Sequence, residues 1–191
     1  MAQPGSFIHP STPVLYLSQG QESSISTDLL ETIIVSDVRS FAQDPRFCLS
    51  VMAEIACRAL SPAVNDPGTA IDVIGRGVRI LSAYAQNKSD EIEVKYPSVH
   101  VAPLQNNDLL EDFFSPVARD GASMREIQIR VLKGLSMLSK GWPGIFAEAA
   151  QTLAFETLEH ATRADHIDSD RYLIKSIYYN LFSGEDSNKK P

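Results

Sequence analysis

Two Asp-Pro pairs constrain this chain more than any other feature of its sequence. In Asp44-Pro45 and Asp66-Pro67, a carboxylate that can accept hydrogen bonds from free backbone N–H groups precedes a proline. The missing N–H of that proline costs nothing at the first position of a helix. Apolar residues recur at helical spacing after each pair. We therefore predict one helix from residue 45 to 60, ending at Ser61-Pro62, and a second from residue 67 to about Asn87.

The second of these helices carries an apolar stripe with steps of three and four residues, which is typical of a face packed on a core. The stripe consists of Ile71, Ile74, Val78, Leu81 and Ala85. Gly75 and Gly77 lie in the same helix and lack the rest of a dinucleotide-binding fingerprint. We expect this pair to permit close packing between helices.

The remaining segments predict a mainly α protein of about six helices with two or three short β-strands, built by helix-on-helix packing. Pro116 is expected to kink or end a helix that starts near residue 107, and Ser123 with Glu126 forms a capping box for the next helix. Further helices are predicted over residues 28–35, from 143 to about 164, and from 168 to about 181. Strands are predicted over residues 14–17 and 92–96, the second continuing through Val99 and Val101.

The 191 residues suggest one main domain. Residues 1–13 contain three prolines and are interpreted as an extended arm. Residues 14–182 are predicted to form a single globular, mainly helical domain. Residues 183–191 are polar and are expected to be a disordered tail.

Charge and hydropathy exclude several classes of function. The net charge is −7, from 17 basic and 24 acidic residues, which argues against nucleic-acid binding and against docking on anionic lipid through bulk charge. No apolar run reaches the 18 or so residues that a spanning helix needs, and residues 1–5 do not start a secretory signal. Cys48 and Cys57 lie about 13 Å apart along one predicted helix, so we expect free thiols. Free thiols are typical of a reducing compartment, which predicts a cytoplasmic location.

The segment from Arg39 to Asp72 resembles the signature of a bacterial family of predicted membrane proteins, the domain of unknown function 2254. The matching positions are Arg39, Gln43, Asp44, Pro45, Phe47, Arg58, Ala59, Leu60, Ser61, Pro62, Asn65, Asp66, Pro67, Thr69 and Ala70. A weaker resemblance extends from about residue 10 to 180 and implies that the chain corresponds to the family's C-terminal soluble domain. Family members begin with several transmembrane helices. The chain is therefore either part of a membrane protein or a stand-alone relative, and the resemblance implies no known reaction.

The signature segment gives the candidate ligand-binding residues. They are Gln43, Asp44, Arg58, Ser61, Asn65, Asp66 and Thr69. In one interpretation they are structural: Asn65 and Ser61 turn the chain, Asp66 caps a helix, and Arg58 binds Asp66 or a loop carbonyl. In the other, Arg58 and Asn65 bind an unknown small ligand, because a turn needs fewer polar side chains than this loop contains.

A metal site is the competing interpretation. Glu156, Glu159 and His160 share a helix face, but without a second copy of the motif they are expected to be solvated. The carboxylates of Asp44, Asp66 and Asp72 could bind Mg²⁺, with Arg58 binding a charged substrate. Such a protein would be a metal-assisted hydrolase, and the absence of any metal-dependent thermal shift would count against it.

We identify no catalytic residue, no metal ligand set and no cofactor motif. The sequence therefore favours a non-catalytic ligand-binding or self-association module that forms a homo-oligomer, with a membrane protein or a transmembrane region as its partner. The metal-assisted hydrolase is the alternative function.

Overall fold

The computed structural model describes residues 1–18, 31–42, 44–88 and 96–182. Its residues form two compact units: Met1–Cys48 with Ser89–Gln105, and Leu49–Lys88 with Asn106–Pro191. A single domain over residues 14–182 stays a prediction.

The first unit contains a short antiparallel pair of strands, β1 (Tyr16–Leu17) and β2 (Val99–His100). Tyr16 pairs with His100 and Leu17 with Val99. Both strands lie where the sequence predicts them, although each is only two residues long. Residues 92–95 of the predicted second strand lie outside the described residues.

Irregular chain makes up most of the rest of the first unit. The N-terminal segment doubles back, because the N–H of Ala2 donates to the carbonyl of Pro13 at 2.8 Å. Gln3 donates from Nε2 to the carbonyl of Pro103 at 2.6 Å. Of the helix predicted over residues 28–35, residues 28–30 lie outside the described residues and 33–35 are not helical, so that part of the prediction is wrong.

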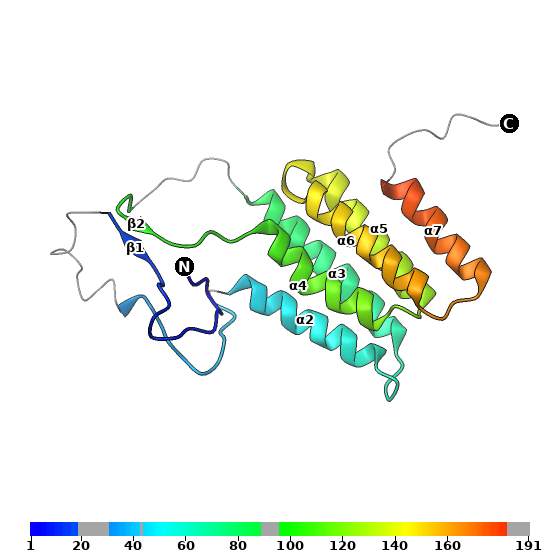
Figure 1. Ribbon diagram of the computed structural model, residues 1–191, viewed down its shortest axis with the longest axis horizontal. Helices are drawn as coiled ribbons and strands as arrows, with labels where there is room; N and C mark the ends of the chain where they lie inside the picture. Colours follow the sequence, from blue (N-terminus) through cyan, green and yellow to red (C-terminus); the bar gives the residue numbers. More distant parts are fainter. Residues whose placement is uncertain (19–30, 43, 89–95, 183–191) are drawn as a thin grey trace. The chain divides into compact units, whose positions relative to one another are not determined.

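Six helices have their bounds within the described residues, which confirms the mainly α prediction (Figure 1). They are α2 (Pro45–Leu60), α3 (Pro67–Gln86), α4 (Asn106–Asp120), α5 (Arg125–Gly141), α6 (Pro143–Arg163) and α7 (Asp168–Phe182). The first four residues of α2 belong to the first unit, and everything after them in these helices belongs to the second.

Helix α5 is the centre of the second unit. It packs against α3, α4, α6 and α7, and α6 also packs against α4 and α7. Its buried side chains include Ile127, Val131, Leu132, Leu135 and Leu138. Burial on this scale makes α5 the helix around which the core forms.

Both Asp-Pro pairs start helices, as predicted. Asp66 is the N-cap of α3, Pro67 is its first residue, and Asn87 is its C-cap. Four residues of the predicted apolar stripe of α3 are buried, and Ile71 is half-buried.

Of the two effects predicted for Pro116, ending the helix is wrong, and the predicted start of the next helix is also wrong. Helix α4 continues through Pro116 to Asp120, because buried Phe113, Phe114 and Val117 fix it on both sides of the proline. The capping box of Ser123 is absent: α5 begins after Met124, whose side chain makes no capping hydrogen bond. A tight turn, in which the N–H of Met124 donates to the carbonyl of Gly121, places the helix start one residue later.

The glycines of α3 differ in their surroundings. A Cβ atom built on Gly77 would collide with the buried ring of Phe113, so Gly77 makes room for this ring of α4 to pack on α3. A Cβ atom on Gly75 would meet nothing within 4 Å. The predicted packing role is therefore confirmed for Gly77 and does not apply to Gly75.

These surroundings predict opposite effects for the same substitution two residues apart. Gly77→Ala should lower the free energy of unfolding by about 1–3 kcal/mol, because the Phe113 ring must move in a packed core. Gly75→Ala should raise it by up to about 1 kcal/mol, since alanine is the better helix former. Equilibrium urea unfolding measures both, and equal effects would contradict the packing role.

Candidate functional site

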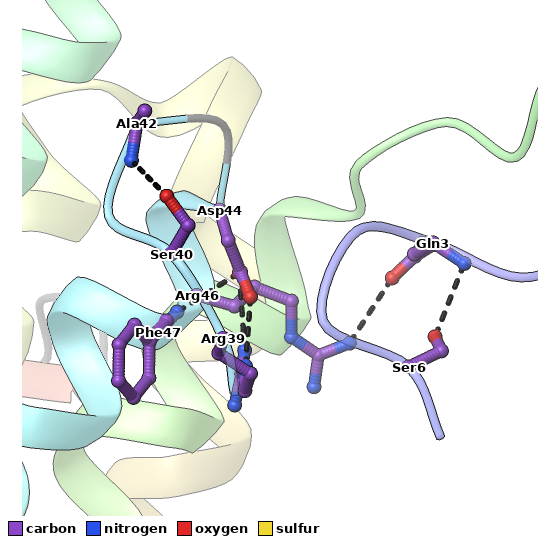
Figure 2. Close-up of polar contacts among 8 residues, drawn as sticks. All are labelled: Gln3, Ser6, Arg39, Ser40, Ala42, Asp44, Arg46 and Phe47. Atoms are coloured by element: carbon purple, nitrogen blue, oxygen red, sulfur yellow. Dashed lines mark hydrogen bonds and ion pairs between the residues drawn. The ribbon is translucent and has the colours of Figure 1, made fainter. Parts of the chain in front are cut away.

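The buried carboxylate of Asp44 lies at the N-terminus of α2 (Figure 2). Asp44 is only 3% exposed, and its Oδ1 accepts a hydrogen bond from the N–H of Phe47 at 3.0 Å. It therefore satisfies a free donor of the first helical turn, as the capping prediction requires.

Arg39 binds the same carboxylate with two hydrogen bonds. Its Nε donates to Oδ2 of Asp44 at 2.7 Å and its Nη2 donates to Oδ1 at 3.0 Å (Figure 2). The guanidinium also lies over the ring of Phe47, 5.0 Å from its centroid. Three residues of the signature thus form one structural cluster, because a forked, charge-assisted pair fixes its partners in both distance and direction.

The N-terminal segment adds to this cluster. Gly5 has a φ of +81°, and a Cβ atom there would collide with the side chains of Asp44 and Arg39. Arg46 donates from Nη1 to Oε1 of Gln3 at 3.1 Å (Figure 2). Sequence reasoning missed these contacts with residues 3–5, since nothing local links them to residue 44.

The loop between α2 and α3 contains the other half of the signature. Asp66 accepts hydrogen bonds from both the N–H and the hydroxyl of Thr69. The hydroxyl of Ser61 donates to the carbonyl of Arg58 at 2.8 Å. Asn65 has a φ of +49°, a left-handed conformation that asparagine tolerates better than most residues. These contacts close the loop by themselves.

Arg58 and Asn65 are the exposed polar side chains of this loop that make no hydrogen bond or ion pair with another described residue. The interpretation that Arg58 binds Asp66 is therefore wrong, since Thr69 supplies the donors to that carboxylate. A ligand that binds this loop would be bound by the guanidinium of Arg58 and the amide of Asn65.

The seven candidate residues form two groups. Asp44 directly precedes α2, whereas Arg58, Ser61, Asn65, Asp66 and Thr69 lie in or after its last turn. A helix of 16 residues is about 24 Å long, so α2 separates the two groups along its axis. Gln43 lies outside the described residues. Ligand binding by these residues stays a prediction.

Two of the groups with displaced pKa values in the second unit lie in or beside the signature loop or on α2. The hydrogen bonds from Thr69 lower the pKa of Asp66 below its ordinary 3.8. Burial, followed by a hydrogen bond to Asp120, raises the pKa of Cys57 to about 12. Asp120 also accepts from Nε of Arg119 at 2.8 Å. Both cysteines are free, as predicted.

A small hollow lies between α4 and α6, and its lining includes Ser115, Glu156 and His160. Its enclosed volume of about 10 Å³ has room for about one water molecule, far below the range of about 300–1,000 Å³ that is typical of small-molecule sites. Glu159 instead pairs with Arg163 at 3.1 Å. Nowhere in the described ranges do three or more His, Cys, Asp or Glu side chains gather closely enough to hold a metal ion.

Fold and signature together define the class of protein: a mainly helical domain in which two capped helices flank the signature loop. The sequence profile of the family described as predicted membrane protein (DUF2254) matches residues 1–137. The chain belongs to this family, which confirms the resemblance seen in its sequence.

The relatives found by sequence similarity are described as uncharacterized, so they indicate no activity for this chain. Uncharacterized proteins of Mycobacterium bovis and of two strains of Mycobacterium tuberculosis are each 61% identical to the chain over 36 residues. Those residues are 19% of this chain and only 7% of each relative, so the match spans a small part of the relatives' length. No solved structure matches. Among the described residues, no helix combines the length and the apolar character needed to cross a membrane.

The left-handed conformation of Asn65 yields a test that separates a turn from a binding site. Asn65→Ala should lower the free energy of unfolding by about 1 kcal/mol, because alanine is strained at positive φ. Asn65→Gly should leave stability nearly unchanged while removing the amide. Urea unfolding of both variants checks this, and equal losses would contradict the turn role. Loss of a retained small mass in native mass spectrometry of Asn65→Gly alone would assign the amide to a ligand.

The lowered pKa of Asp66 predicts an acid-dependent stability. A carboxyl group whose pKa is lower in the folded than in the unfolded state stabilises the fold above its unfolded pKa. This stabilisation is lost as the pH falls through the folded pKa. The wild type should therefore unfold at a higher temperature than Asp66→Asn at neutral pH, and the difference should vanish in acid. Thr69→Val removes the hydroxyl donor, so the stabilisation by Asp66 should be lost at a higher pH than in the wild type. If the difference in unfolding temperature between the wild type and Asp66→Asn did not depend on pH, the lowered pKa of Asp66 would be contradicted.

Proposed function

We propose that this chain is a non-catalytic self-association module of a membrane-protein family, located on the cytoplasmic side of the membrane. The observation that carries the proposal is the outer face of α7, where large aromatic side chains are exposed. Tyr172 is 76% exposed and Tyr179 is 49% exposed. They are seven residues apart and so lie on one face of the helix, two turns from each other.

The opposite face of α7 fixes the helix to the second unit. Ile174 is fully buried, and it is the one buried residue of α7. Asp170 pairs with Arg125 of α5 at 2.7 Å, and Arg171 donates to the carbonyl of Ala164. The aromatic face is therefore presented on a helix whose position is fixed by other contacts.

Such a face is suited to a protein partner. Tyrosine has a large apolar body and a polar hydroxyl, which makes it frequent in protein interfaces. A second copy of the chain is the simplest partner, because a symmetric dimer needs one self-complementary surface. The two tyrosines would then be buried against each other or against neighbouring residues of α7.

The three carboxylates that a metal-assisted hydrolase would use are each bound to another side chain, which supports a non-catalytic role. Asp44 binds Arg39, Asp66 accepts from Thr69, and Asp72 pairs with Arg76 at 2.7 Å. A metal-assisted hydrolase would need these three carboxylates on one ion, whereas each is engaged with a different partner. Ligand binding through Arg58 and Asn65 is compatible with self-association, since neither residue lies on α7.

Sedimentation velocity over a range of protein concentrations tests the proposal. We expect the wild type to form a dimer or larger oligomer, and the double variant Tyr172→Ser/Tyr179→Ser to weaken association about tenfold or more, because aromatic residues dominate interface energies. Circular dichroism should show an unchanged helix content, since both side chains are exposed.

Ile55→Ser is the matched control, because Ile55 is also 49% exposed but lies on α2. It should associate like the wild type. A wild type that is monomeric at every concentration would overturn the proposal, as would an equal loss of association in Ile55→Ser.

A further inference from the structure

A stripe of basic residues follows the outer side of α5. Arg130, Lys133, Met137 and Lys140 are exposed and are separated by steps of three and four residues. Residues at this spacing share one face of a helix. The rest of α5 between residues 127 and 138 is mostly buried, so this face is where the helix meets solvent.

Helix α3 adds another cation beside this stripe. A Cβ atom on Gly134 of α5 would lie 2.9 Å from Cγ2 of Val78, which marks a close contact between the two helices. Arg79 follows Val78 and Lys133 precedes Gly134, and both are exposed. Both cations are therefore exposed residues that lie one position from this helix contact.

The basic residues of the stripe are not neutralised by carboxylates. In the described part of the chain, the side chains of Arg79, Arg130, Lys133 and Lys140 form no ion pair. Six other arginines in that part are paired with carboxylates, whereas Arg58 is not; the paired ones are Arg39, Arg76, Arg119, Arg125, Arg163 and Arg171. The stripe is thus a local positive surface. The net charge of the whole chain is −7, so composition alone does not indicate this surface.

We propose that this basic stripe, formed by Arg79, Arg130, Lys133, Lys140 and Met137, docks on the anionic headgroups of a lipid bilayer. Neighbouring unpaired cations complement a negatively charged membrane surface. Met137 is 64% exposed among them and can enter the boundary of the acyl chains, as apolar residues of interfacial helices do. Membership of a predicted membrane-protein family places a bilayer close to the domain.

Co-sedimentation with vesicles tests this docking. The chain should bind vesicles of phosphatidylcholine mixed with phosphatidylserine, bind vesicles of phosphatidylcholine alone much less, and dissociate as salt is added, because salt screens exposed charges. Lys133→Glu should lower the partition coefficient about tenfold by removing one cation and adding a repulsive charge.

Lys175→Glu is the matched control, since it makes the same charge change at an exposed position of α7. It should bind like the wild type, and so should Tyr172→Ser/Tyr179→Ser, which makes this test independent of self-association. Equal binding to neutral vesicles, an equal loss in Lys175→Glu, or no vesicle binding would overturn the proposal. Binding of polyglutamate without any vesicle binding would assign the stripe to an acidic protein instead.

Discussion

The second unit depends on the burial of α5 among four other helices. Because α5 contacts α3, α4, α6 and α7, most of its length is removed from water. Glycines make room for side chains of neighbouring helices: Gly134 faces Val78, and Gly77 faces Phe113. A core assembled around one helix explains why α4 passes through Pro116 without ending, since packing on both sides outweighs one missing hydrogen bond.

Each of the two Asp-Pro pairs in the signature segment starts a helix, and this role accounts for much of the segment. Asp44 and Asp66 occupy equivalent places before α2 and α3, but their surroundings differ. Asp44 is buried and binds an arginine, whereas Asp66 is exposed and binds its own helix through Thr69. The first arrangement joins Arg39, Asp44 and Phe47 into one cluster, and the second closes a local loop. The same dipeptide therefore serves a tertiary purpose at one end of α2 and a local purpose at the other.

This difference also explains what could be predicted from the sequence. Helix limits that depend on local chemistry, such as Asp66-Pro67 and Asn87, follow directly from residue types. Contacts between distant segments, such as Gly5 with Asp44, leave no local pattern and were not predicted. The start of α5 was misplaced by a similar cause, because the turn at Gly121 decides it rather than the side chain of Ser123. The positive stripe was hidden by the net charge, since only the structure shows which cations are paired.

The contact between Cys57 and Asp120 has a consequence for the chemistry of the protein. A thiol reacts with oxidants and alkylating agents as the thiolate, and a carboxylate beside it disfavours that form. Burial and this carboxylate raise the pKa of Cys57 to about 12, so the thiolate is disfavoured at neutral pH. Cys57 is therefore expected to react more slowly with oxidants and alkylating agents than an ordinary exposed cysteine.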